Sequence, residues 1–421
     1  MDASYRAPLS LATEDLAVDA GELECDPVEA LARIGATMIL SRYIEAEVSA
    51  HLGAEPYERT EERSGSRNGH RRRKVSCSVG TLDIDFPKVR DAETPFRSQV
   101  LTRWQRTSAT VMATLPQLYV EGLSTRDFER ALTPMWKGTS LSRSTISRAN
   151  EQIKQAFQKW RHRSLALEEI AYLFLDGHYE GVRLGTKEKE AVLVIHGITK
   201  TGVRTLLGLY LGCRESTDGW RLALEDLVLR KLSPPMLVIS DGNPGLIRAV
   251  EEIWPGVPRQ RCTVHRTRNV LARVPKKDHK RVSQSLNEIF YAPCLEEALA
   301  AARRFAGRWQ NVYPEATTIL GKDLSDCLTF FRFPPRHWVR LRTSNILERC
   351  FKEVKRRTRV IGRFPTEMSA LSLIWSVMDE NSKTWNGMIM DKAHQSQALA
   401  AMESLRKEPI IVKGFEELLA A

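Results

Sequence analysis

The sequence AYLFLD at residues 171–176 and the sequence MLVISD at residues 236–241 are short apolar runs that each end at an aspartate. An apolar run of this length, bounded by turn residues, predicts a buried strand. The carboxyl ends of neighbouring parallel strands meet at one edge of a sheet, where open α/β sheets bind their ligands. We therefore expect Asp176 and Asp241 to converge at such an edge.

The segments around these two runs predict an α/β layer. Further strands are expected over residues 191–197, 203–211 and 260–264, and an amphipathic helix over 217–230. Asn243-Pro244 supplies an N-cap and a first-turn proline for a helix that ends near residue 253. The order β-β-β-α-β-α-β is typical of a mixed sheet covered by helices.

A third carboxylate, Glu348, lies within the predicted helix TSNILERCFKEVK at residues 343–355. Carboxylate oxygens are hard ligands that suit Mg²⁺ or Mn²⁺, and three unpaired carboxylates would repel one another without a metal. Two ions held by such a cluster activate an attacking oxygen and stabilise the leaving oxygen in phosphoryl transfer. Asp176, Asp241 and Glu348 are therefore the predicted catalytic and metal-binding residues, although each alone would be read as an ordinary strand-end or surface acid.

Charge points to a polyanionic partner. The chain has 421 residues with 63 Lys and Arg against 52 Asp and Glu, a formal net charge of +11. Residues 59–74 and 349–363 each carry seven basic residues, a pattern that fits either phosphate contact or a solvated face. The expected DNA contacts in these runs are Arg71, Arg72, Arg73, Lys74, Lys352, Lys355 and Arg356. Lys352 and Lys355 share a helix face with Glu348, where a simple Glu–Lys pair is the alternative.

The N-terminal part is expected to be mainly helical. Helical spacing covers residues 27–52, a loop is expected over 56–70 and a strand over 74–87. Between residues 107 and 160, a capped start at Ser124, a turn at Lys137-Gly138 and a helix from Ser142 predict a helix-turn-helix, or else a plain helical hairpin. Its expected DNA contacts are Arg143, Ser144, Thr145 and Arg148.

Two further features narrow the class of protein. No run of 18 apolar residues is present, so a membrane-spanning protein is excluded. The seven cysteines form no CxxC pair, which favours reduced thiols and a cytoplasmic location. Trp309 is expected either to pack in a core or to stack on a base, and His178 either to support Asp176 or to be structural.

Six stretches in order resemble the transposases of the prokaryotic IS256 group, relatives of the Mutator superfamily. They are RNGHRRRKV (67–75), LYVEGLSTRDFERAL (118–132), LDGHYEGVR (175–183), ISDGNPGL (239–246), QRCTVHRTRNVL (260–271) and RTSNILERCFKEVKRRTRVIGRFP (342–365). The resemblance implies an RNase H-like mixed-sheet catalytic core whose DDE triad falls on Asp176, Asp241 and Glu348. It also implies an all-α insertion before Glu348, and mainly helical N-terminal DNA-binding domains ahead of the core.

The resemblance also implies a Cys-x2-His element at Cys262 and His265, which is half a zinc site with no second half nearby in sequence. We expect Cys262 to pack under the sheet and His265, with Arg268, to face DNA. The sequence departs from the family at Ser344, where threonine is usual, and at Asn243-Pro244, where a lysine-containing turn is common. Neither change removes an expected metal ligand.

The expected domains follow from these assignments. They are a flexible leader (1–30), an N-terminal helical and β DNA-binding region (31–100), a helix-turn-helix domain (101–165), the first part of the catalytic core (166–265), the all-helical insertion (266–335), the second part of the core (336–395) and a C-terminal tail (396–421).

The expected function is that of a transposase. It would bind the terminal inverted repeats of an insertion sequence and target double-stranded DNA, and would cut and join strands with two Mg²⁺ or Mn²⁺ ions. The resemblance further implies a copy-out/paste-in route, a homodimer in the synaptic complex and association with the nucleoid. A DNA-binding regulator that does not cut, and an RNase H-like structure-specific nuclease that does not join strands, are the alternatives.

Overall fold

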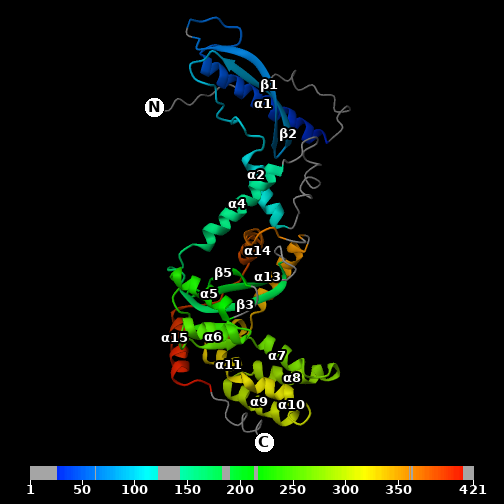
Figure 1. Ribbon diagram of the computed structural model, residues 1–421, viewed down its shortest axis with the longest axis vertical. Helices are drawn as coiled ribbons and strands as arrows, with labels where there is room; N and C mark the ends of the chain where they lie inside the picture. Colours follow the sequence, from blue (N-terminus) through cyan, green and yellow to red (C-terminus); the bar gives the residue numbers. More distant parts are fainter. Residues whose placement is uncertain are drawn as a thin grey trace. The chain divides into compact units, whose positions relative to one another are not determined.

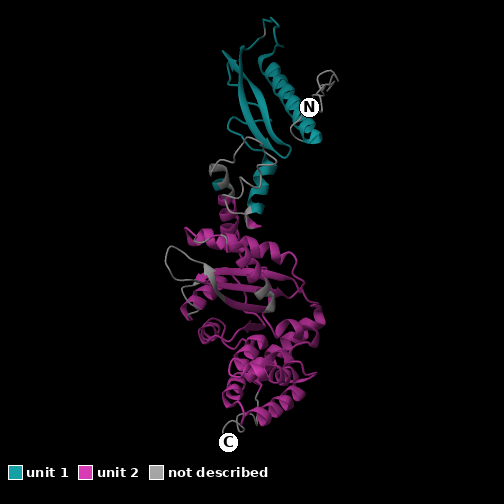
Figure 2. Cartoon of the chain, turned by 90° about the vertical axis from the view of Figure 1, so that its right-hand side faces the viewer, with its two compact units in different colours: residues 1–119, 125–149 teal, residues 120–124, 150–421 magenta. Residues whose placement is uncertain are grey.

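The computed structural model describes residues 26–61, 63–121, 143–182, 190–212, 217–359, 361 and 364–410. The chain forms two compact units, residues 1–119 with 125–149 and residues 120–124 with 150–421 (Figure 2). Of the described helices, none is long and apolar enough to cross a membrane.

The first unit is built on a helix and a two-stranded antiparallel sheet (Figure 1). Helix α1 (Pro27–Leu52) begins after Asp26, whose side chain accepts a hydrogen bond from the Val28 amide at 2.8 Å. Strands β1 (Ser66–Cys77) and β2 (Gly80–Arg90) form a hairpin, and α1 packs against it. The apolar residues that hold these elements together are Ile44, Val75, Leu82, Ile84, Phe86 and Leu101.

The hairpin corrects the expectation for this region. We expected a loop up to residue 70 and one strand over residues 74–87, but β1 already begins at Ser66. The basic run of β1 lacks the alternating apolar residues that predict a strand. Arginine side chains take the place of apolar ones and cover Phe86 of the partner strand with their stems and guanidinium groups. The Arg71 guanidinium, for example, lies 5.2 Å from the centre of the Phe86 ring.

After the hairpin the structure describes two further helices before the second sheet, α2 (Ala109–Val120) and α4 (Arg143–Arg161). The expected helix from Ser142 through Trp160 is therefore confirmed within one residue at each end. The preceding part of the expected helix-turn-helix, residues 122–142, lies outside the described residues.

The second unit contains a five-stranded mixed sheet of order β5-β4-β3-β6-β7. β3 (Ile170–Val182), β4 (Glu190–Thr199) and β5 (Arg204–Gly212) form an antiparallel meander. β6 (Leu237–Ser240) runs parallel to β3, and β7 (Arg259–Arg261) runs parallel to β6. The expected mixed α/β sheet is confirmed, although the last strand is shorter than expected because a helix begins directly after Cys262.

Helices cover both faces of this sheet. α5 (Thr217–Leu229) and α6 (Pro244–Ile253) pack on the face formed by Leu173, Leu175 and Val238. The opposite face, which carries Tyr172, Phe174, Leu237 and Ile239, shares one apolar core with the helices that follow β7. These helices are α7 (Thr263–Leu271), α8 (His279–Phe290), α9 (Leu295–Trp309), α10 (Pro314–Lys322), α11 (Leu324–Leu328) and α12 (Trp338–Leu341), with 3₁₀ turns at Lys276–Asp278, Thr329–Arg332 and Pro335–His337.

Gln260 connects the helical segment to the sheet. Its buried side-chain amide donates to the Cys327 carbonyl at 2.9 Å and accepts from the Phe330 amide at 2.7 Å. Residues 263–341 are mainly helical, and Trp309 lies in their core, where its indole N–H donates to Ser285 at 3.3 Å. The interpretation of Trp309 as a core residue is therefore confirmed, and the alternative of base stacking is wrong.

The last described elements are α13 (Asn345–Thr358), α14 (Glu367–Ser382) and α15 (Lys392–Lys407). α13 contacts β3 and α14, and α14 contacts β5 (Figure 1). α15 contributes Ala398 and Ala401 to the core of the second unit, together with Ile410 just beyond its end.

Candidate active site

Parallel pairing of β3 and β6 places two aspartates side by side. Leu175 pairs with Ser240, and Asp176 and Asp241 are the residues that directly follow this pair. Neighbouring strands lie about 4.8 Å apart, so the two carboxylates extend from adjacent points of the backbone. Asp176 is 6 % exposed, and Asp241 is half-buried. The sheet thus brings together two acids that are 65 residues apart in the sequence.

The first aspartate does not end its strand, contrary to our expectation. β3 continues to Val182 along β4, where Asp176 pairs with Val194. Pairing with β6, by contrast, stops at Leu175. Asp176 therefore lies within a strand, paired with β4, at the point where the parallel pairing with β6 ends.

A tight turn fixes the second aspartate. Its Oδ1 accepts a hydrogen bond from the Asn243 amide at 3.0 Å, and Asn243 in turn caps α6 by accepting from Gly245 at 2.8 Å. Gly242 between them has a φ of +83°, a conformation that favours glycine. A Cβ at this position would lie 2.6 Å from the Arg261 guanidinium. The sequence Asp-Gly-Asn-Pro therefore serves the geometry of this turn.

Hydrogen bonds bring the start of α13 to the same edge of the sheet. The backbone amide and hydroxyl of Ser344 lie 3.4 and 3.5 Å from the Cys262 sulfur, to which they donate. The Thr263 amide donates to the Arg342 carbonyl at 2.9 Å. Cys262 follows β7 directly, and its own amide donates to the Ser240 carbonyl at 2.7 Å, one residue before Asp241.

Glu348 lies one helical turn after Ser344 in α13. Residues four apart share one face of a helix. The backbone of Glu348 therefore lies one turn along α13 from Ser344, which is bonded to Cys262. The side chain of Glu348 lies outside the described residues, as does that of His178.

A histidine adds positive charge beside the two aspartates. The hydrogen bond to Cys262 raises the pKa of His265, burial opposes this rise, and the charges of Cys262, Asp176 and Asp241 add to it. Burial raises the pKa of the Cys262 thiol, but the hydrogen bond and charge of His265 outweigh that effect and leave the pKa below its usual value. The protonated imidazole therefore offsets part of the repulsion between the two carboxylates.

The chemistry of these side chains fits a hard divalent cation. Asp176 and Asp241 offer carboxylate oxygens, which Mg²⁺ and Mn²⁺ prefer as protein ligands. Among the described side chains, no group of three or more His, Cys, Asp or Glu residues could hold a metal ion. That description does not include the side chain of Glu348.

Basic side chains follow on α13 and α7. Lys352, Lys355 and Arg356 are exposed on α13, where Arg356 pairs with Glu353 at 3.2 Å. Arg268 is exposed on α7, three residues after His265. These cations lie on α7 and α13. Cys262 directly precedes α7 and accepts the hydrogen bonds from Ser344, the residue before α13.

The basic run of β1 divides between two faces of the hairpin, because side chains alternate along a strand. Arg71 and Arg73 both lie over the Phe86 ring, at 5.2 and 4.8 Å from its centre. Arg72 pairs instead with Asp85 at 3.8 Å, and Lys74 lies opposite Asp83. The four residues therefore do not form one contact surface. On α4, Arg148 is exposed, whereas the side chains of Arg143, Ser144 and Thr145 lie outside the described residues.

Sequence reasoning missed a buried histidine beside the site. His196 pairs with Phe174 across β3 and β4, is fully buried and lies 5.4 Å from the Trp385 ring. Within the described part of the chain neither ring nitrogen has a hydrogen-bond partner. Burial, and then the charge of Arg204, lowers its pKa to about 3. The signal was available, because His196 directly follows the apolar run AVLVI (191–195) within the same expected strand.

Comparison with known proteins gives one consistent family. Residues 11–387 match the family model described as "Transposase, Mutator family". The chain is 36% identical over 348 residues to a transposase for insertion sequence element ISRM5 from Rhizobium meliloti, covering 82% of this chain and 86% of the relative.

Two further relatives are similar over almost the same span. A transposase for insertion sequence element IS406 from Burkholderia multivorans is 36% identical over 83% of this chain and 89% of its own length. A transposase for insertion sequence element IS256 in transposon Tn4001 from Staphylococcus aureus is 32% identical, with the same two shares.

Proposed function

The chain belongs to the Mutator family of transposases, and we propose that it cuts and joins DNA strands at the ends of an insertion sequence by a DDE mechanism. Asp176, Asp241 and Glu348 are the proposed catalytic carboxylates. The observation that carries this proposal is the register of β3 and β6, which places Asp176 and Asp241 at neighbouring positions.

The fold supports an assignment of the sheet as an RNase H-like core. The order β5-β4-β3-β6-β7 combines an antiparallel meander with two strands parallel to β3. The helical segment that follows β7 returns at Arg342 and Ser344, both bonded to residues next to β7. Both ends of this insertion therefore meet at the edge that carries the aspartates.

Two Mg²⁺ or Mn²⁺ ions are the proposed cofactors, held by Asp176, Asp241 and Glu348. When bound, they would supply activation of the attacking water or 3′-hydroxyl and charge stabilisation at the leaving oxygen. Asp241 is oriented for this task by the Asn243 amide, and Asp176 by its place in the sheet. His265 lowers the local negative charge, and the exposed cations of α7 and α13 would bind phosphates next to the cleaved bond.

The DNA that this site acts on is proposed to be double-stranded, with the terminal inverted repeats of the element as its specific part. The relatives are named as transposases for insertion sequence elements, which supports this choice. A copy-out/paste-in route and a homodimer in the synaptic complex belong to the same proposal and rest on the family.

An in vitro reaction on a duplex carrying one element end tests the proposal. We expect strand cleavage with Mg²⁺, no cleavage with EDTA, and transfer of a pre-cut 3′ end into target DNA. Asp241→Asn should retain DNA binding and lose cleavage, since the amide keeps the shape of the side chain and removes its charge. Cleavage by this variant at the wild-type rate would contradict the assignment.

The same reaction separates the alternative functions. Cleavage without strand transfer would identify a nuclease, and binding without cleavage at any divalent ion would identify a regulator.

A further inference from the structure

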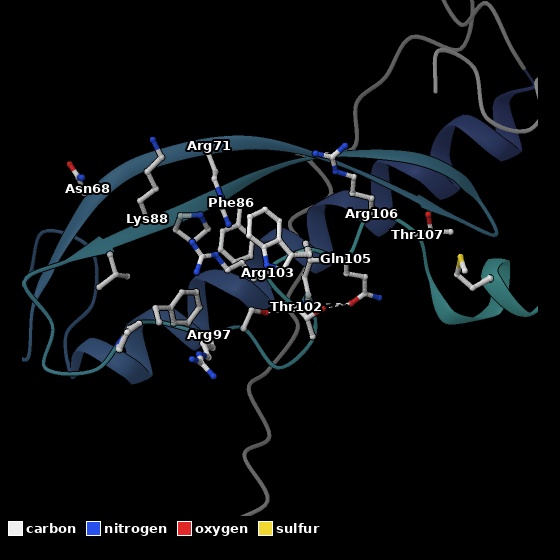
Figure 3. A pocket seen from close by; sticks show the side chains of 18 of the residues that line it. Asn68, Arg71, Phe86, Lys88, Arg97, Thr102, Arg103, Gln105, Arg106 and Thr107 are labelled. Atoms are coloured by element: carbon white, nitrogen blue, oxygen red, sulfur yellow. Dashed lines mark hydrogen bonds between the residues drawn. The ribbon is translucent and has the colours of Figure 1, made fainter. Parts of the chain in front are cut away.

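A cavity of about 1440 Å³ lies within the first unit, between the β1–β2 hairpin and the segment that follows it. Figure 3 shows the labelled side chains from both sources, with Arg71 and Lys88 on the strands and Arg97, Arg103 and Arg106 on the following segment. This segment, residues 95–107, supplies most of one wall.

The charge of the cavity lining has a single sign. Its lining residues include six cations and no acidic residue, the cations being Arg71, Lys88, Arg97, Arg103, Arg106 and Arg148. Arg71, Lys88, Arg97, Arg103 and Arg106 are exposed, and none of these five forms an ion pair with an acidic residue of the described chain. The opposite face of the hairpin differs, because Arg72 is paired there with Asp85. A solvated surface normally mixes both signs, so this lining favours a polyanionic ligand.

Hydrogen bonds to β1 hold the backbone of the cavity wall formed by residues 95–107. Arg73 donates from Nη2 to the carbonyls of Thr102 and Gln105, at 2.9 Å in each case. Ser76 accepts from Ser108 at 2.8 Å and donates to the Arg106 carbonyl at 2.9 Å. These bonds fix the backbone of the segment beside β1, so its arginines start from positions next to Arg71. Burial, followed by the charges of Arg71 and Arg106, lowers the pKa of Arg73, which is consistent with a positive potential at this place.

An aromatic side chain completes the lining. Trp104 is 78 % exposed, and the Arg103 guanidinium lies 5.1 Å from its ring. An indole is rarely left in water to this extent. In duplex DNA, basic side chains contact the phosphates and an exposed aromatic ring makes apolar contact with base edges in a groove.

We propose that this cavity binds the DNA of the element end, with Arg71, Lys88, Arg97, Arg103 and Arg106 on the phosphates and Trp104 against base edges in a groove of the duplex. The inference rests on the proposed function for the identity of the polyanion. It assigns DNA contacts to the segment of residues 95–107, which the sequence did not single out, and it removes Arg72 and Lys74 from the contact surface.

The test compares two double variants of equal charge change in the full-length protein. Arg71→Ala/Arg103→Ala removes two cavity cations, and Arg72→Ala/Lys74→Ala removes two cations from the other face of the same hairpin. Binding of a fluorescent duplex that carries the element's inverted repeat is measured at several salt concentrations. Each lost phosphate contact lowers the salt slope by about 0.9, which corresponds to about eightfold in affinity at 0.1 M salt.

We expect the cavity pair to bind about 60-fold more weakly at 0.1 M salt, with a slope reduced by about 1.8. The control pair should change binding by less than about threefold, since neither residue touches the bound strand. Trp104→Ala should weaken binding roughly tenfold, and Trp104→Phe should restore most of it, because a phenyl ring still makes apolar contact with a base edge. Circular dichroism spectra and thermal unfolding of the four variants should match the wild type, since the substituted residues are exposed.

Equal losses in the two double variants would overturn the proposal, because charge alone would then explain them. Unchanged binding by the cavity pair would also overturn it. Neither result affects the proposed function, which is tested separately by cleavage and strand transfer with Mg²⁺ in the wild-type protein and in Asp241→Asn.

Discussion

Replacing His196 with phenylalanine should remove part of the acid sensitivity of the second unit. In the folded protein this histidine has a pKa of about 3, against an ordinary value of 6.5. Below pH 6.5, His196 therefore takes up a proton in the unfolded chain but stays neutral in the folded chain until the pH approaches 3. The stability linked to His196 is complete above pH 6.5 and declines as the pH falls below that value.

The magnitude follows from the two pKa values. Each pH unit below 6.5 lowers the free energy of unfolding by about 1.4 kcal/mol, so the loss reaches about 2 kcal/mol at pH 5. At pH 5 this figure is insensitive to the folded pKa, provided that pKa lies well below 5. His337, whose pKa burial also lowers, contributes to acid sensitivity in both proteins and cancels in the comparison.

Urea unfolding at pH 7.5 and pH 5.0, followed by tryptophan fluorescence, measures the effect, since seven of the nine tryptophans belong to the second unit. Between the two pH values, wild type should lose about 2 kcal/mol more than His196→Phe. His162→Gln, which removes an exposed histidine of the same unit, is the control and should behave as wild type. An equal pH dependence in wild type and His196→Phe would refute the reasoning, because His196 would then be protonated or hydrated when folded.

Substitutions at three further positions test the geometry of the second unit. Gly242→Ala should lower the free energy of unfolding by about 1–3 kcal/mol and displace Arg261, which the new Cβ would approach to 2.6 Å. DNA cleavage should fall even where urea unfolding shows that the variant is folded. Cleavage at the wild-type rate would contradict the turn geometry. Cys262→Ala should reduce cleavage more than DNA binding, because the amide of Ser344 loses its acceptor at the start of α13, while Cys262→Ser should retain more activity; identical kinetics for both variants and wild type would exclude a positioning role. Gln260→Leu should cost about 2–4 kcal/mol in urea unfolding, since two buried backbone groups lose their partner, and a loss below about 0.5 kcal/mol would show that water replaces it.

Much of the second unit could be predicted because its strands are apolar throughout. The runs ending at Asp176 and Asp241 are buried on both faces of a sheet, and this burial requires the continuous apolar pattern that the sequence displays. The turn after Asp241 was predictable from Asn243-Pro244, since capping chemistry is local.

The first unit was harder to predict, for a physical reason. Strand β1 stacks arginines on an aromatic ring, so that its sequence shows charge where a strand normally shows alternation. The cationic cavity is assembled from two strands, a following segment and Arg148, and no local pattern indicates that these parts meet. Similarly, the bond from Ser344 to Cys262 spans 82 residues, and sequence spacing cannot reveal such a contact.

The apolar core on the aspartate-bearing face of the sheet unites Phe174 with Ile410, at nearly opposite ends of the second unit's sequence. During synthesis on a ribosome, the strand that carries Asp176 emerges more than 200 residues before the last helix that covers its neighbours. The nascent chain consequently cannot complete this core until α15 and Ile410 have been synthesised. Chains truncated before α15 should therefore expose part of this apolar core to solvent.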